Sequence, residues 1–150
     1  MCIRDRFTLI QCDVKGDPVQ FRGVLSEEIT ANCLASADLY RRIGFVEPWV
    51  SYLAVDSGTV VGGGAFVGPP KDNRVEIAYY TLKEFEGKGF GMNIARHLVA
   101  IAIDAEPGIT VSAFTLPEPN ASNRILIKLE FKFFGLAHDS DAGEVWEWRA

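Results

Sequence analysis

A glycine-rich loop between two segments of different period is the feature that most constrains the fold of this chain. Val75 to Leu82 is rich in β-branched and aromatic residues and predicts a central strand. Gly87-Lys88-Gly89-Phe90-Gly91 follows, and then Met92 to Ala105, where apolar residues recur with a helical period. Ile109 to Thr115 predicts the next strand. Strand, loop, helix and strand form a βαβ unit, so part of the sheet must be parallel.

The segments on either side of this unit predict further strands and helices. The segment from Ser26 to Ile43 predicts helix, with Ser26 as its N-cap and Gly44 as its stop, and it is compatible with one helix or two. A short helix is expected from about Ser122. The remaining strands are expected at Phe7 to Cys12, Ser51 to Val55, Thr59 to Val67, Phe131 to Ala137 and Glu144 to Arg149. The result is a mixed α/β sheet.

Length and composition limit the domain organisation. The chain has 150 residues, of which 48% are hydrophobic and 23% charged, as expected for one globular domain. Residues 1–6 are mostly polar without a period and are interpreted as a non-native or disordered N-terminal segment, which leaves 7–150 as a single domain. No apolar run approaches the roughly 20 residues of a membrane-spanning helix, so we expect a cytoplasmic protein.

The charge and the cysteines exclude several classes of partner. The net charge is -5, with acids and bases mixed along the chain, which argues against nucleic acid or an anionic membrane as a partner. Cys2, Cys12 and Cys33 form neither a C-x-x-C pair nor an even set and are expected to be ordinary reduced thiols. His97 and His138 have no second ligand at metal-binding spacing, so no metal site is predicted.

The glycine loop is a candidate anion site. A helix entered through glycines exposes unpaired backbone N–H groups at its positive end, which favours phosphate, although a tight turn without a ligand remains an alternative. A nucleoside triphosphate loop would need Ser or Thr after its lysine, whereas Lys88 is followed by Gly89. A dinucleotide loop starting at Gly87 or Gly89 would need glycine where Met92 or Ile94 stands.

Two blocks of sequence, in this order, resemble the GNAT acetyltransferases. The first is Val75 to Tyr80 with Glu86 to Gly91 and Ala95-Arg96; the second is Thr115 to Leu126 with Lys128 to Phe131. The second block is similar to the branch that acetylates protein N-termini, such as those of ribosomal proteins. The resemblance implies the GNAT acyl-CoA N-acyltransferase fold, with a mixed central sheet of about seven strands flanked by about four helices.

The same resemblance implies an N-acetyltransferase. Acetyl-CoA would be the co-substrate, and its acetyl group would pass to a primary amine, of a protein N-terminus or a small molecule, by direct attack in a ternary complex. The backbone at Thr81 and Leu82 matches the family segment that holds the pantetheine arm, and the loop matches the pyrophosphate site. The residues expected to contact acetyl-CoA are Tyr80, Thr81, Leu82, Gly87, Lys88, Gly89, Phe90, Gly91, Met92, Asn120 and Ser122.

The chain departs from the family pattern at four places. Glu86 stands where the family loop usually has Arg or Gln, and Pro119 where it has Asn, with Asn120 one step later. Glu130 replaces a helix-ending glycine. Leu126 occupies the position of a tyrosine that serves many members as general acid, so that role is not carried over.

Glu76 and Ser122 are the candidate catalytic residues. Attack on a thioester needs a neutral amine, and an alkyl amine is mostly protonated at neutral pH, so a base is required. Glu76 matches an acid that the family often has on its central strand; its alternative is a buried carboxylate paired with Arg74 or another cation. Ser122 matches a serine proposed to protonate the leaving thiolate; its alternative is a helix N-cap.

The acceptor side is the least defined part of the sequence. Tyr79 and Tyr80 must point to opposite faces of their strand, so at most one lines the acetyl site. Trp49, Trp146 and Trp148 are expected in the core, with an acceptor groove as the alternative. The exposed edges of the final hairpin would support a homodimer. A non-catalytic acyl-CoA-binding or sensing domain and a purely structural interaction domain are the competing functions.

Overall fold

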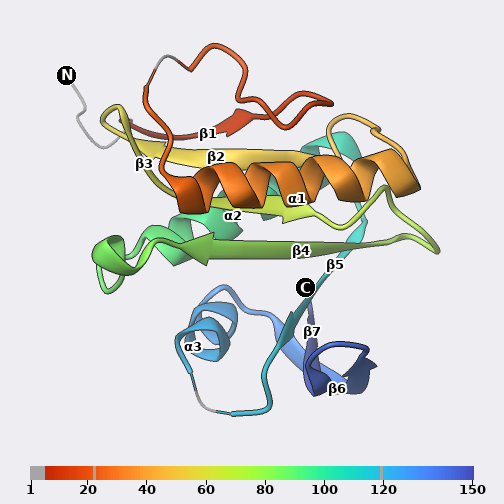
Figure 1. Ribbon diagram of the computed structural model, residues 1–150. Coiled ribbons are helices and arrows are strands. Elements are labelled where there is room, and N and C mark those ends of the chain that lie inside the picture. Colours follow the sequence, from red (N-terminus) through yellow and green to blue (C-terminus); the bar gives the residue numbers. More distant parts are fainter. Residues whose placement is uncertain (1–5, 22, 119) are drawn as a thin grey trace.

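The structure is a computed structural model that describes residues 6–21, 23–118 and 120–150. Its strands form one mixed sheet in the order β1-β2-β3-β4-β5-β7-β6 (Figure 1). The strands are β1 (Phe7–Gln11), β2 (Ser51–Asp56), β3 (Thr59–Phe66), β4 (Arg74–Thr81), β5 (Thr110–Thr115), β6 (Lys132–Asp139) and β7 (Gly143–Arg149). The helices are α1 (Glu27–Ile43), α2 (Phe90–Ala105), α3 (Ala121–Lys128) and the short 3₁₀ helix η2 (Lys83–Phe85).

The predicted fold class is confirmed, and the seven strands are those predicted to within one or two residues at each end. The described residues hold three α-helices rather than about four, because the segment from Ser26 to Ile43 folds as the single helix α1. The predicted N-terminal segment lies outside the described residues apart from Arg6. None of the described helices is long and apolar enough to cross a membrane.

Local sequence explains both ends of α1. Ser26 accepts a hydrogen bond from the Ile29 backbone N–H at 3.3 Å, and Gly44 donates its N–H to the Tyr40 carbonyl at 2.8 Å. Its buried residues recur at helical spacing: Ile29, Cys33, Ala37 and Tyr40. The side chain of Tyr40 also reaches the sheet, where its hydroxyl donates to the Phe66 carbonyl at 2.6 Å.

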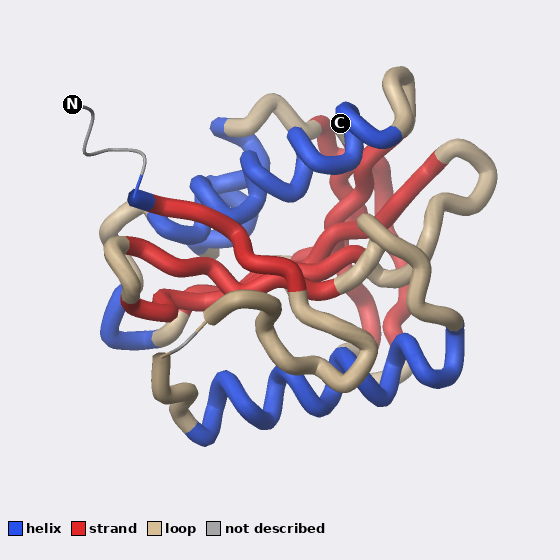
Figure 2. The backbone as a smooth tube through the Cα atoms, turned by 90° about the horizontal axis from the view of Figure 1, so that it is seen from above, coloured by secondary structure: helices blue, strands red, loops and turns tan. Residues whose placement is uncertain are grey.

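The sheet separates two helical layers. Helix α1 lies across one face and α2 across the other, as the view from above also shows (Figure 2). Ile94 and Leu98 of α2 are fully buried in the main core. On the other side of β5 lies β7, and the indole N–H of its Trp148 donates to the hydroxyl of Thr115 on β5 at 3.0 Å. Trp49 and Trp148 are buried, which confirms the core interpretation of these tryptophans.

Three consecutive glycines, Gly62 to Gly64, let β3 come close to its neighbours. A Cβ on Gly63 would lie 2.8 Å from the hydroxyl of Tyr80. A Cβ on Gly64, on the other face, would lie 2.8 Å from Leu98 and 2.9 Å from Ile94. The helix and the tyrosine ring therefore occupy space that any other residue would fill.

We expect Gly64→Ala to lower the free energy of unfolding by about 1–3 kcal/mol, because overpacking displaces the core side chains of α2. The matched control is Gly135→Ala on strand β6, where an added Cβ has no neighbour within 4 Å. Urea denaturation of both variants checks the difference. Equal stability of the two variants would show that α2 can shift away from the sheet without cost.

Candidate functional site

Strands β4 and β5 separate before β4 ends. Their parallel ladder runs from the Arg74–Thr110 pair to the Ile77–Ala113 pair and stops there, whereas β4 continues to Thr81. Figure 1 shows the two strands diverging, with α3 beyond the gap. The last four residues of β4 are therefore paired on one side only.

The register with β3 determines which backbone groups are left free. Glu76 accepts a hydrogen bond from Val67, and Leu82 donates one to Val61, so the even-numbered residues between them direct their backbone groups toward β3. The odd-numbered residues face the other way. Past the end of the β5 ladder, the N–H and C=O groups of Tyr79 and Thr81 point into the gap.

The start of α2 lies at one end of this gap and lacks a cap. Its N-cap is Gly89, which has a φ of 87° and no side chain to accept a hydrogen bond, and its first turn holds no acidic residue. By contrast, Ser26 caps α1 and Asn120 caps α3. Of the three α-helices in the described ranges, α2 is the one whose N-cap accepts no side-chain hydrogen bond, so its first backbone N–H groups and its positive dipole end lack a partner within the chain. An anion would supply what a cap supplies elsewhere.

These features line a cleft of about 500 Å³, which we call the loop cleft. Its lining includes eight of the residues predicted to contact acetyl-CoA: Tyr80, Thr81, Gly87, Gly89, Phe90, Gly91, Met92 and Ser122. Arg124 and Lys128 of α3 also line it, although the sequence analysis assigned them no role. They lie one helical turn apart on the same side of α3, and Glu86 lines the same cleft.

The other three predicted contact residues do not line the loop cleft. Leu82 is buried, and its N–H is already bonded to Val61, so it has no donor to offer. Lys88 is exposed beside the ring of Phe85, with its Nζ 5.9 Å from the ring centroid. Asn120 caps α3 by accepting from the Asn123 N–H at 3.0 Å.

Because Asn120 caps α3, Ser122 does not have the N-cap role that was its alternative. The N-cap position of α3 belongs to Asn120, so the prediction of Ser122 as N-cap is wrong. The helix begins one residue earlier than expected, at Ala121. The Ser122 side chain is therefore available to the cleft that it lines.

Tyr79 lies beside Ser122 in the loop cleft. Burial raises the pKa of the Tyr79 phenol to about 12, and the neighbouring Ser122 hydroxyl lowers it by a smaller amount. The contact between the two hydroxyls falls outside hydrogen-bond geometry, and within the described ranges the buried Oη of Tyr79 has no hydrogen-bond partner. The phenol therefore stays protonated at neutral pH, and its O–H group has no hydrogen-bond acceptor among the described residues.

A second cleft, of about 320 Å³, lies between α1 and the sheet, and we call it the helix cleft. Asn32, Ser36 and Leu39 line it from α1, and Ala78 of β4 is exposed on its floor. Its wall also includes the free, buried thiols of Cys12 and Cys33; Cys2 lies outside the described residues. Tyr79 and Tyr80 line both clefts, and we call this shared stretch of β4 the junction of the two clefts.

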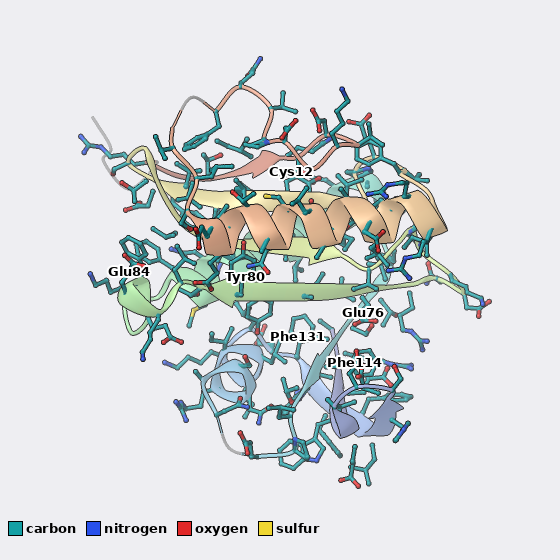
Figure 3. All side chains as sticks on the ribbon, in the orientation of Figure 1. Cys12, Glu76, Tyr80, Glu84, Phe114 and Phe131 are labelled. Atoms are coloured by element: carbon teal, nitrogen blue, oxygen red, sulfur yellow. The ribbon has the colours of Figure 1, made fainter. Side chains whose placement is uncertain are left out.

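Glu76 lies outside both clefts, in a smaller hollow that Ser112 and Phe114 of β5 also line (Figure 3). Burial is the main reason that the pKa of Glu76 is raised to about 7, with smaller contributions from Asp139 and Glu147. Arg74 lowers this pKa, but it forms no ion pair with Glu76 among the described residues. The predicted alternative, a carboxylate paired with Arg74 or another cation, is therefore not observed among the described residues.

Glu76 lies on the face of β4 that borders the helix cleft. Side chains two residues apart share a face of a strand, so Glu76 lies on the face of Ala78 and Tyr80, about 7 Å along the strand from Ala78. A group on the floor of the helix cleft would reach the Glu76 carboxylate through water rather than by direct contact.

Solved structures with this fold include several acetyltransferases. RimL, the ribosomal L7/L12 alpha-N-protein acetyltransferase, has a TM-score of 0.70 and 15% identity, with 99% of this chain and 92% of RimL covered. The ribosomal-protein-S5-alanine acetyltransferase of Vibrio fischeri has a TM-score of 0.69 and 12% identity, with 97% and 92% covered. The putative acetyltransferase yncA of Salmonella typhimurium has a TM-score of 0.63 and 18% identity, with 97% and 93% covered. At these identities the similarity shows a shared fold.

Comparison of the sequence itself gives the family. No curated protein matches it. The family model of the acetyltransferase (GNAT) domain matches residues 17–132, well over half of the chain. The chain therefore belongs to the GNAT acetyltransferase family.

Proposed function

We propose that this protein transfers the acetyl group of acetyl-CoA to a primary amine by direct attack in a ternary complex. The observation that carries the proposal is the junction of two clefts at Tyr79 and Tyr80 of β4. One cleft offers an uncapped helix start, two cations and a free strand edge, and the other opens from the opposite face of the sheet. Two substrates would meet where the clefts meet.

The loop cleft has the donors that coenzyme A requires. The N–H groups at the start of α2, with Arg124 and Lys128, would hold the pyrophosphate. The free backbone groups of Tyr79 and Thr81 would pair with the pantetheine amides as an added strand does. Solved structures of RimL with coenzyme A and of yncA with acetyl-CoA support this placement at the level of the fold.

Glu76 and Ser122 would move the protons of the reaction. The amine nitrogen bonds to the thioester carbon, the C–S bond breaks, and the sulfur leaves as thiolate. Glu76 would accept the proton that the amine loses, through water, because its raised pKa of about 7 is suited to a base at neutral pH. Ser122, free of a capping role, would donate toward the leaving sulfur.

The alternative is a domain of the same fold that binds acyl-CoA without turnover. Two observations favour it: Glu86 places a carboxylate on the rim of the phosphate site, and the fully buried Leu126 stands where many members have a tyrosine acid. Both functions predict coenzyme A binding, and only the first predicts thiol release.

The lining of the helix cleft bears on the acceptor. All of its lining residues carry uncharged side chains, so within the described residues no carboxylate faces the cleft to pair with a second ammonium group. We infer an acceptor amine on a short, uncharged and largely apolar body in preference to a polyamine, because an unpaired buried charge is costly.

The phosphate site is tested by Gly89→Val, which should weaken acetyl-CoA binding about 10- to 100-fold by obstructing one or two charge-assisted hydrogen bonds. The control is Gly108→Val, at a glycine with the same φ of +87° and no neighbour within 4 Å, so both variants carry the same backbone strain. Calorimetric titration measures the affinities. Equal affinity of the two folded variants would place the pyrophosphate elsewhere.

The base is tested by Glu76→Gln. With a protonated alkylamine as acceptor, we expect the turnover loss to be about 100-fold near pH 8 and to shrink toward pH 10, where more of the amine is already neutral. Affinity for acetyl-CoA should stay unchanged. A loss that does not vary with pH would remove Glu76 from proton transfer.

The free energy of unfolding of Glu76→Gln tests the role of Glu76 independently of turnover. The folded pKa of Glu76 is raised, so the folded state holds its proton more tightly than the unfolded state, and wild-type stability falls as pH rises from about 4 to about 7. The glutamine variant lacks this loss. From pH 5 to pH 8 it should gain about 1–2 kcal/mol relative to wild type in urea denaturation, allowing for partial solvent screening. A structural ion pair would instead make the variant less stable at pH 8.

The acceptor class is tested with n-pentylamine and cadaverine, which share a five-carbon chain but carry one and two amino groups. We expect kcat/KM to be higher for pentylamine by about tenfold or more. A preference for cadaverine would overturn the inference and would point to Glu76, the carboxylate on the same face of β4, as the partner of the second ammonium.

A further inference from the structure

Tyr79 has a buried hydroxyl that the fold does not use. Its Oη is shielded from solvent and unpaired, and among the described residues only one other buried side-chain atom, Oδ1 of Asn123, shares that condition. An unpaired buried hydroxyl costs stability, so native proteins seldom keep one without a reason. Phenylalanine would pack the same ring without that cost.

The surroundings of this hydroxyl indicate a ligand. Tyr79 lines the loop cleft beside Ser122, and it also stands at the junction with the helix cleft. The reacting thioester would lie at this junction under the proposed function. Two hydroxyls from different elements, β4 and α3, therefore converge on the place where a sulfur would gain negative charge.

The chemistry of the phenol limits its role to donation. Because burial raises its pKa to about 12, the phenol stays protonated at neutral pH and is a weaker acid than a thiol, whose pKa is about 8.5. It can hold a hydrogen bond to a thiolate but has no tendency to transfer its proton to one. The proton that finally reaches the sulfur must come from solvent, and Ser122 would relay it, because a serine hydroxyl is itself too weak an acid to give up its proton without receiving another.

We propose that Tyr79 Oη donates a hydrogen bond to the coenzyme A sulfur as the C–S bond breaks. This inference rests on the proposed function for the identity of the ligand. A thioester sulfur is a poor acceptor and a thiolate a strong one, so the bond forms as charge develops and stabilises the transition state more than the bound substrate. Tyr79 thereby supplies a donor in a chain whose Leu126 replaces the family's tyrosine.

The test pairs Tyr79→Phe with Tyr40→Phe. We expect Tyr79→Phe to lower kcat about tenfold with little change in the KM for acetyl-CoA, and to leave the midpoint of urea denaturation unchanged or higher. Tyr40→Phe removes a satisfied buried hydrogen bond to the Phe66 carbonyl, and Tyr40 itself lines neither cleft, so it should lower the denaturation midpoint and leave kcat unchanged. Tyr79→Phe should therefore lower kcat without loss of stability, and Tyr40→Phe should lower stability without loss of kcat.

A second measurement works without turnover. The ultraviolet absorbance of the thiolate reports the thiol pKa of coenzyme A bound to each protein. A donor to the thiolate lowers this pKa, so Tyr79→Phe should raise it by about one unit, the same tenfold effect, and Tyr40→Phe should not.

The outcomes separate the two proposals. If wild type binds no coenzyme A, the proposed function and the role of Tyr79 both fail. If wild type binds it and Tyr79→Phe retains both kcat and the bound-thiol pKa, only the role of Tyr79 is overturned. A shifted thiol pKa in a protein without turnover would support the donor and favour the acyl-CoA-binding alternative.

Discussion

The early end of the β4–β5 ladder is the constraint on which the rest of the site depends. A parallel pair that continued to Thr81 would consume the backbone groups of Tyr79 and Thr81 and close the gap. Because pairing stops at Ile77 and Ala113, the central strand keeps one full edge in the core of the protein and one open edge facing α3. The two clefts then share Tyr79 and Tyr80 as lining residues.

Much of this arrangement could be predicted from local sequence. The apolar period placed α1 and α2, and Ser26 and Gly44 marked the ends of α1 because caps act within one turn. The glycine loop predicted a candidate anion site, and the structure leaves the helix start that follows the loop without a side-chain cap, which is a local property. The nearly continuous apolar character of β4 identified it as the central strand.

The remaining features depend on distant parts of the chain. Whether Tyr79 or Tyr80 offers its backbone to the gap is set by the register with β3, which neither strand encodes alone. The roles of Arg124 and Lys128 depend on how α3 is rotated about its axis, and Ser122 lost its expected cap role to a residue two positions away. The sequence placed Gly62 to Gly64 within a strand but gave no reason for the three glycines, which appears only when Leu98 and Tyr80 are placed against them.

The uncapped start of α2 also ties ligand binding to the folding of the helix. In α1 and α3 the first turn is completed by the chain itself, through Ser26 and Asn120. In α2 no side chain completes the first turn, so this turn lacks the internal support that the other two helices have. A bound phosphate would act as the missing residue of the helix. Binding would then be coupled to the local stability of this turn, which would increase with the concentration of the ligand.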